Sequence, residues 1–182
     1  MPVTLVNTEI QALTVLRSFL LGILPTATEV IRAEINRVPE PRVADFCLLT
    51  PSSRMRLSTN VNTYTDGYPS SPGTRTAMQP TQVTVQIDVH GPNSADNAQI
   101  ITTLLRDDYA YQVFAASGYG IAPLYAGDAT QMPFFNGEQQ VEFRWVIEAV
   151  LQVNTTITTP QDFAANASIG IINVDAAYPP GD

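Results

Sequence analysis

The amino-acid sequence predicts an α+β domain with a mainly antiparallel sheet of four to five strands and two main helices packed on one face. Two segments space their apolar residues as helices do, and several others alternate apolar and polar residues as strands do. Because strands and helices do not alternate regularly along the chain, a parallel sheet is disfavoured. The 182 residues, 45% of them hydrophobic, are expected to form one domain over residues 1–182, with a loose tail from about residue 176.

The first helix is predicted to begin after Thr8. Thr8 and Gln11 have the spacing of a capping box, in which each residue satisfies a backbone donor of the other. Apolar residues then recur at spacings of three and four, which indicates one buried face made of Ile10, Leu13, Leu16, Leu20 and Ile23. Leu24 and Pro25 are expected to end the helix.

Short strands are predicted next, at residues 29–35, 45–49 and 54–64. Pro39 and Pro41 lie between the first two and hold the backbone extended. The strand with the clearest alternation covers residues 82–90, where every second residue is Val or Ile. A second helix is expected from Asn93 or Ser94 to about Ala115.

Prolines, glycines and serines predict two long loops, at residues 65–80 and 117–137. After the second loop, residues 141–153 alternate as a long strand. The order Thr159-Pro160-Gln161-Asp162 is typical of a helix start, so a short helix is expected there. A last short strand is predicted at residues 169–174.

The charge of the chain limits its function. There are 17 acidic residues against 9 basic ones, all of them arginine, which gives a net charge of −8. This excess of acid argues against a sequence-reading nucleic-acid binder, but it allows a channel wall past which DNA slides. Charged residues make up only 14% of the chain, against about 25% in typical domains, and this favours buried subunit interfaces.

Candidate catalytic residues are few. Cys47 and His90 could be imagined as a nucleophile and its base, but each fits its strand better as a core thiol and a strand-end histidine. One histidine and one cysteine cannot complete a zinc site, and neither a metal nor a cofactor is predicted. At Arg144, which shares a strand face with Glu142 and Glu148, a cross-strand ion pair is favoured over an acid/base dyad. The sequence therefore predicts a protein that is not an enzyme.

The location is also predicted. A single cysteine suits a reducing compartment, and no stretch has the form of a signal peptide or a membrane span. We therefore expect synthesis in a bacterial cytoplasm and no membrane partner.

Both predicted loops are rich in aromatic residues and methionine with little charge, a composition typical of protein–protein contacts. The alternative for any single aromatic residue is a loop folded back over its own domain. The candidate subunit or partner interface is Asn36, Arg37, Pro39, Glu40, Pro41, Tyr68, Met78, Tyr119, Tyr125, Phe134 and Phe135.

Several short motifs follow one another along nearly the whole chain. They are Asn36-Arg37-Val38-Pro39-Glu40-Pro41, Asp45-Phe46-Cys47-Leu48-Leu49-Thr50-Pro51, Asp88-Val89-His90-Gly91-Pro92 within residues 81–99, Arg106-Asp107-Asp108-Tyr109-Ala110, Pro123-Leu124-Tyr125, Asn136-Gly137-Glu138-Gln139-Gln140 and Thr159-Pro160-Gln161-Asp162-Phe163. By the order and number of these motifs, the chain resembles the phage neck terminator family of long-tailed bacteriophages, also called tail terminator or tail completion proteins.

The resemblance implies a structural virion protein at the neck, with no catalytic residues. It implies a homohexameric ring that caps the finished tail tube, stops tube polymerisation and docks the head-side connector, while double-stranded DNA passes through its hole. The partners would be the chain itself, the tail tube protein and the connector. Three alternatives stay open: another head–tail adaptor or tube protein, a small Cys/His hydrolase, and a binding module for a host protein.

Overall fold

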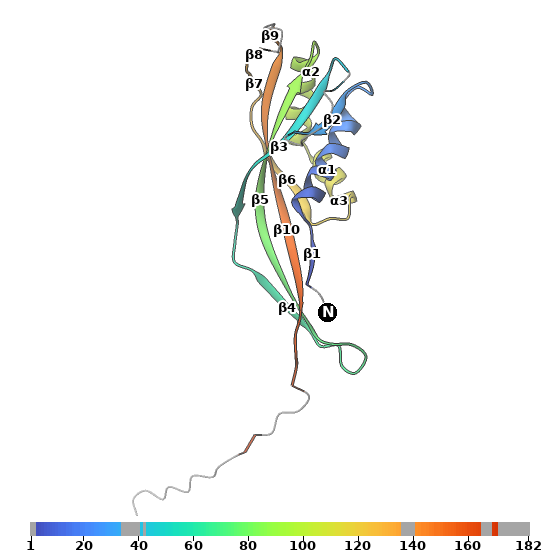
Figure 1. Ribbon diagram of the computed structural model, residues 1–182, viewed down its shortest axis with the longest axis vertical. Helices are drawn as coiled ribbons and strands as arrows, with labels where there is room; N and C mark the ends of the chain where they lie inside the picture. Colours follow the sequence, from blue (N-terminus) through green and yellow to red (C-terminus); the bar gives the residue numbers. More distant parts are fainter. Residues whose placement is uncertain (1–2, 34–40, 42, 136–140, 165–168, 171–182) are drawn as a thin grey trace, which may run out of the picture.

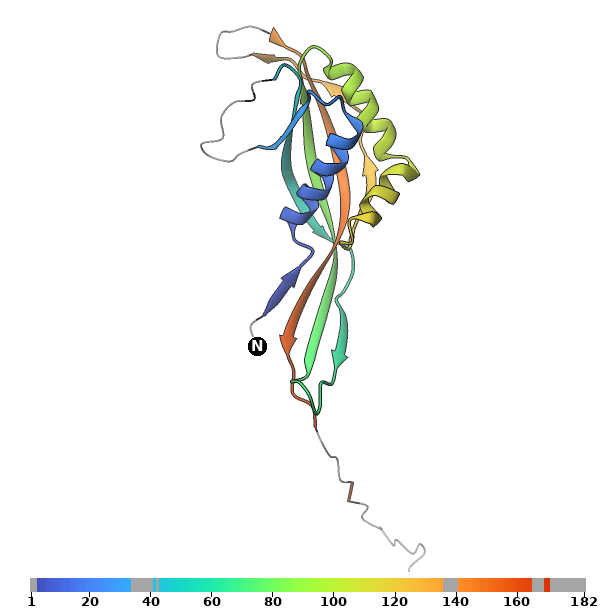
Figure 2. The same ribbon diagram turned by 90° about the vertical axis from the view of Figure 1, so that its right-hand side faces the viewer.

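A computed structural model describes residues 3–33, 41, 43–135, 141–164 and 169–170, and shows an elongated molecule (Figure 1). In the upper part, helices cover one face of a curled sheet; the sheet then continues beyond the helices (Figure 2). We call residues 3–6, 54–80 and 154–164 the arm, and the remaining described residues the body. The arm differs from the body in that none of its residues is buried.

The α+β class is confirmed, but the number of elements is larger than predicted. In the described residues the main sheet has eight strands rather than four to five, and three helices replace the two main ones. The helices are α1 (Glu9–Ile23), α2 (Ser94–Leu105) and α3 (Asp108–Ala116). The strands are β1 (Thr4–Val6), β2 (Glu29–Arg32), β3 (Phe46–Arg56), β4 (Val61–Thr65), β5 (Thr74–His90), β6 (Ile121–Ala126), β7 (Thr130–Gln131), β8 (Phe134–Phe135), β9 (Val141–Glu142) and β10 (Arg144–Pro160).

The sheet is organised around β5 and β10, which pair antiparallel from His90 and Arg144 to Thr74 and Pro160. The strand order is β1-β10-β5-β3-β2; β4 also pairs with β5, and β6 and β7 also pair with β10. Among the strand pairs that the structure describes in this sheet, β2 and β3 alone are parallel. A separate two-stranded sheet is formed by β8 and β9.

The core lies between the body sheet and the helices. The predicted alternation of residues 82–90 and 141–153 is confirmed, since their apolar side chains on the helix side are buried. From the helices, Leu16 and Phe19 of α1, Ile101 of α2 and Phe114 of α3 are also buried. None of the described helices lies on the opposite face of the sheet, which we call the open face (Figure 2).

The first helix begins as predicted. The Gln11 backbone amide donates to Thr8 Oγ1 at 3.3 Å, and the Thr8 amide donates to Gln11 Oε1 at 2.7 Å, which completes the capping box. The predicted buried face was wrong at one position, because Ile10 is 65% exposed. It lies in the first turn, where it lines an open surface pocket with Leu13, Arg32 and Leu49 instead of entering the core.

The second helix is interrupted. Instead of one helix to about Ala115, α2 ends at Leu105 and α3 begins at Asp108. The Asp107 carboxylate accepts a hydrogen bond from the Tyr109 amide at 2.9 Å and caps α3. Apolar spacing continues across the break, so periodicity alone does not reveal it.

The prediction of long loops at residues 65–80 and 117–137 was wrong. Residues 65–80 contain a tight turn around Gly67, whose carbonyl accepts from the amides of Ser70 and Ser71, and then the first part of β5. Residues 117–137 contain β6, β7 and β8. Pairing with β10 supplies the backbone hydrogen bonds of β6 and β7.

The predictions at other segments had mixed outcomes. Residues 54–64 are not one strand, because β3 ends at Arg56 and β4 starts at Val61. The short helix predicted at Thr159 was wrong: β10 continues to Pro160, and the Gln161 amide donates to the Gly73 carbonyl. Of the predicted last strand, residues 169–170 are not in a strand, and the rest lies outside the described residues.

Candidate assembly surfaces

The sheet register separates the only cysteine from the only histidine. Cys47 pairs with Val89, and Phe46 pairs with His90. Because side chains alternate along strands, Cys47 points to the helices and His90 to the open face. Burial, together with the charge of Asp45 and Asp88, raises the pKa of the Cys47 thiol to about 12. These two residues therefore cannot act as a nucleophile and its base.

We expect Cys47 to resist the thiol reagent DTNB at pH 8 in the native protein and to react fully in denaturant. A pKa of about 12 leaves so little thiolate that labelling is expected to be about a thousandfold or more slower than for an exposed thiol. Absorbance measures the reaction, and a Cys47→Ala chain gives the background. Rapid, stoichiometric labelling of the native chain would contradict the buried position.

The open face carries a cluster of polar side chains on β5 and β10. Arg144 donates through Nε and Nη2 to Asp88 Oδ1 at 3.0 and 2.7 Å, which confirms the predicted cross-strand ion pair. Gln86 donates to both oxygens of the same carboxylate. His90 stacks on Phe46 with ring centroids 4.6 Å apart, and burial lowers its pKa. The Arg144–Asp88 pair connects β10 to β5, and the Phe46–His90 stack connects β3 to β5.

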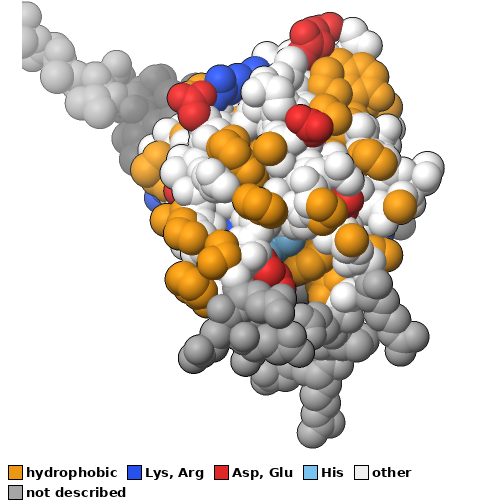
Figure 3. Space-filling view, turned by 90° about the horizontal axis from the view of Figure 1, so that it is seen from above, with side chains coloured by type: hydrophobic (Ala, Val, Ile, Leu, Met, Phe, Trp, Pro, Cys, Tyr) orange, Lys and Arg blue, Asp and Glu red, His pale blue; other side chains and the backbone are white. Residues whose placement is uncertain are grey.

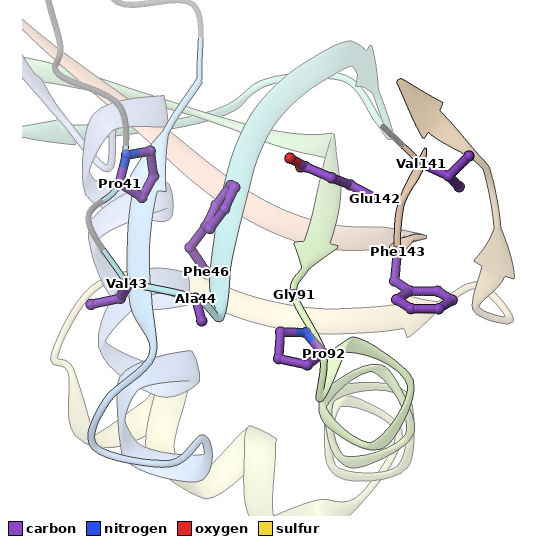
Figure 4. Close-up of a pocket in the computed structure, with 9 residues that line it drawn as sticks. All are labelled: Pro41, Val43, Ala44, Phe46, Gly91, Pro92, Val141, Glu142 and Phe143. Atoms are coloured by element: carbon purple, nitrogen blue, oxygen red, sulfur yellow. The ribbon is translucent and has the colours of Figure 1, made fainter. Parts of the chain in front are cut away.

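A pocket lies at the end of the body opposite the arm. In Figure 4, Phe46 and the Glu142 side chain point toward each other across it, while Val141 points away. Seen from this end, the surface has many apolar side chains and few charged ones (Figure 3). The lining residues are Pro41, Val43, Ala44, Phe46, Gly91, Pro92, Val141, Glu142 and Phe143. We call this the end surface.

The arm presents two different faces, which the register defines. Arg56 lies opposite Thr81, and Arg75 lies between Tyr64 and Thr159. With Arg54 and Ile157 these residues form what we call the arginine face. The other face has no charged side chain on its paired strands. We call it the threonine face: Thr4, Val6, Val61, Thr63, Thr65, Thr74, Thr76, Met78, Thr156 and Thr158.

A third exposed surface lies where α3 meets β6. Tyr111, Leu124 and Tyr125 are large and exposed. Arg106 stacks over the Tyr125 ring at 5.3 Å and donates to Asp128 at 2.7 Å. The pocket between these elements is also lined by Asp107 and Asp108. We call the set of Arg106, Asp107, Asp108, Tyr111, Leu124, Tyr125 and Asp128 the α3–β6 surface.

The comparison with protein families decides the kind of protein. A family model described as phage neck terminator protein matches residues 11–175, which include most of the body and the arm. The chain belongs to the phage neck terminator protein family. This is a family of structural virion proteins of the phage neck and tail. A search of curated proteins finds no match.

The predicted interface residues of this neck terminator protein fall on three separate surfaces. Tyr68 is at the tip of the arm, 82% exposed, and Met78 is half-buried on the threonine face. Tyr125 belongs to the α3–β6 surface, with Tyr119 exposed just before β6. Pro41 lines the end surface, and Phe134 and Phe135 form β8 beside β9. Asn36, Arg37, Pro39 and Glu40 lie outside the described residues.

The neck terminator chain also exposes groups that the sequence does not single out. The arginine face and the acidic part of the α3–β6 surface both depend on strand register and on the break between α2 and α3. No helix among the described residues is long and apolar enough to cross a membrane. Nor do the described residues include a cluster of three or more side chains suited to a metal ion.

Proposed function

We propose that this protein forms a homohexameric ring that caps the tail tube, ends its polymerisation and joins the tail to the head-side connector. The ring is assembled in the cytoplasm of the host, and DNA passes through its hole. The main support for this proposal is the structure of the arm. It is a sheet without a buried residue, and such a sheet gains stability by packing against another surface.

Two further observations support this role. The end surface and the arm lie at opposite ends of the molecule, as a protein between two partners requires (Figure 1). Six chains with a net charge of −8 each give a ring of strongly negative charge, and like charge near the hole keeps DNA from sticking. We assign the arm, the end surface and residues 36–41 to contacts with neighbouring chains, tube or connector.

Light scattering tests the proposal. We expect a species of about 119 kDa, six times the 19.8 kDa of one chain, either alone or on addition of the matching tail tube protein. A head–tail adaptor would not bind tube ends, and a tube protein would stack into longer polymers. A monomer that ignores tube protein would contradict the proposed function.

A further inference from the structure

The described charges are divided unequally between the two parts of the molecule. The body carries ten carboxylates and four arginines, a net charge of −6. The arm carries three arginines and two carboxylates, a net charge of +1. Of these carboxylates, Asp66 lies in the turn at the tip and Asp162 beyond the end of β10. The paired strands of the arm thus carry only positive charge, and all of it lies on the arginine face.

Two of the arm's arginines lack a carboxylate partner among the described residues. Arg54 is paired with Glu9 at 2.6 Å. Arg56 donates to the Ser58 carbonyl and to Asn60 Oδ1, and Arg75 donates to Asn62 Oδ1. Arg75 Nε is also buried without a hydrogen-bond acceptor in the described part of the chain. A guanidinium that donates only to neutral oxygens can form stronger, charge-assisted hydrogen bonds with a carboxylate from another chain.

The α3–β6 surface has the matching chemistry. Asp107 and Asp108 line a pocket with the exposed Tyr111, Leu124 and Tyr125, and the exposed Asp128 is paired with Arg106, the one arginine of this surface. The arginine face likewise has exposed apolar side chains, Tyr64 and Ile157, beside its charged ones. Both surfaces therefore combine exposed apolar groups with charges of opposite sign, as specific interfaces do.

We propose that the arginine face of one chain binds the α3–β6 surface of a second copy of the same chain. The two surfaces are different, so each copy uses one of each, and repetition of this contact by rotation closes a ring. The inference rests on the proposed function, since it names the surfaces that join the ring. The threonine face and the end surface stay available to other partners.

Charge reversal tests the contact in the full chain. Arg56→Glu with Arg75→Glu places acid against acid, and we expect the concentration at which rings dissociate to rise about tenfold or more. Asp108→Arg with Asp128→Arg is expected to have the same effect from the other side. A chain with all four substitutions restores opposite charges at every contact and is expected to recover rings. Light scattering over a concentration series measures each variant.

A matched control places new charge on the other face of the arm. Thr4→Glu with Thr63→Glu, two positions of this face that are not paired with each other, is expected to leave the rings intact, while circular dichroism confirms that every variant is folded. Wild-type-like rings in the Arg56/Arg75 variant would overturn the inference and leave the proposed function standing. Rings lost in that variant but not recovered in the fourfold chain would overturn the α3–β6 surface as the partner of the arginines. Rings lost in the threonine-face control would overturn the choice of face.

Discussion

Phe19→Ala is expected to lower the free energy of unfolding by about 4 kcal/mol. Phe19 is 1% exposed and packs against two rings of α3, with centroid distances of 5.7 Å to Phe114 and 6.3 Å to Tyr109. Its removal leaves a cavity between α1 and α3, which surrounding side chains cannot close without losing contacts of their own. Urea denaturation of the monomeric chain, followed by circular dichroism, measures the effect.

Ile10→Ala in the same helix is the control. Ile10 is mostly exposed, and its truncation is expected to change the free energy of unfolding by about 0.5 kcal/mol or less. Equal effects of the two substitutions would mean that α1 does not pack on α3 through Phe19.

Arg144→Met is expected to lower the free energy of unfolding by about 3 kcal/mol. The Asp88 side chain is 5% exposed and receives two hydrogen bonds from Arg144. Without the guanidinium, the carboxylate stays buried and keeps the hydrogen bonds from Gln86, and an uncompensated buried charge is strongly destabilising. Urea denaturation again measures the effect.

Two further variants isolate the cause. Arg56→Met removes an arginine that bonds only neutral oxygens on the exposed arm, and a change of about 0.5 kcal/mol or less is expected. Asp88→Leu combined with Arg144→Met removes both charges and is expected to recover most of the loss. If the double variant were as unstable as Arg144→Met alone, packing rather than charge would explain the effect.

The elements that could be predicted from sequence are those with a local signal or one buried face. The capping box at Thr8 is local, and the alternation of residues 82–90 follows from burial on the helix side. The arm lacks that signal. Residues 74–80 are strand, but neither of their faces is buried, so apolar and polar residues need not alternate there.

Prolines and local motifs misled the prediction elsewhere. Pro123 occurs in β6 beside a register shift, and Pro51 in β3 beside another, both positions where a strand tolerates proline. Thr159-Pro160-Gln161-Asp162 has the form of a helix start, but pairing of Pro160 with Thr74 keeps it in β10. Long-range pairing, which the sequence does not display, determines these segments.

The sequence predicted which kinds of residue the candidate surfaces contain, but not which of these residues lie on the same surface. Exposed Tyr68, Tyr125 and Phe135 follow from aromatic residues in charge-poor segments. Their assignment to different surfaces depends on how β4, β6 and β8 pair. The same applies to Cys47 and His90, which a register shifted by one residue would place on the same face.

The arm's lack of a second layer has a consequence for how assembly can be followed. Backbone amides that depend on an uncovered sheet open without unfolding of the body, so their hydrogens exchange with solvent early. The amides of Val83, Val85 and Ile87 in the same strand β5 are under the helices and exchange only when the core opens. The strand β5 therefore contains slowly exchanging amides in the body and rapidly exchanging amides in the arm. When a neighbouring chain covers the arm, exchange in the arm slows while that of the core amides stays the same, so deuterium uptake along β5 measures the fraction of chains that are assembled.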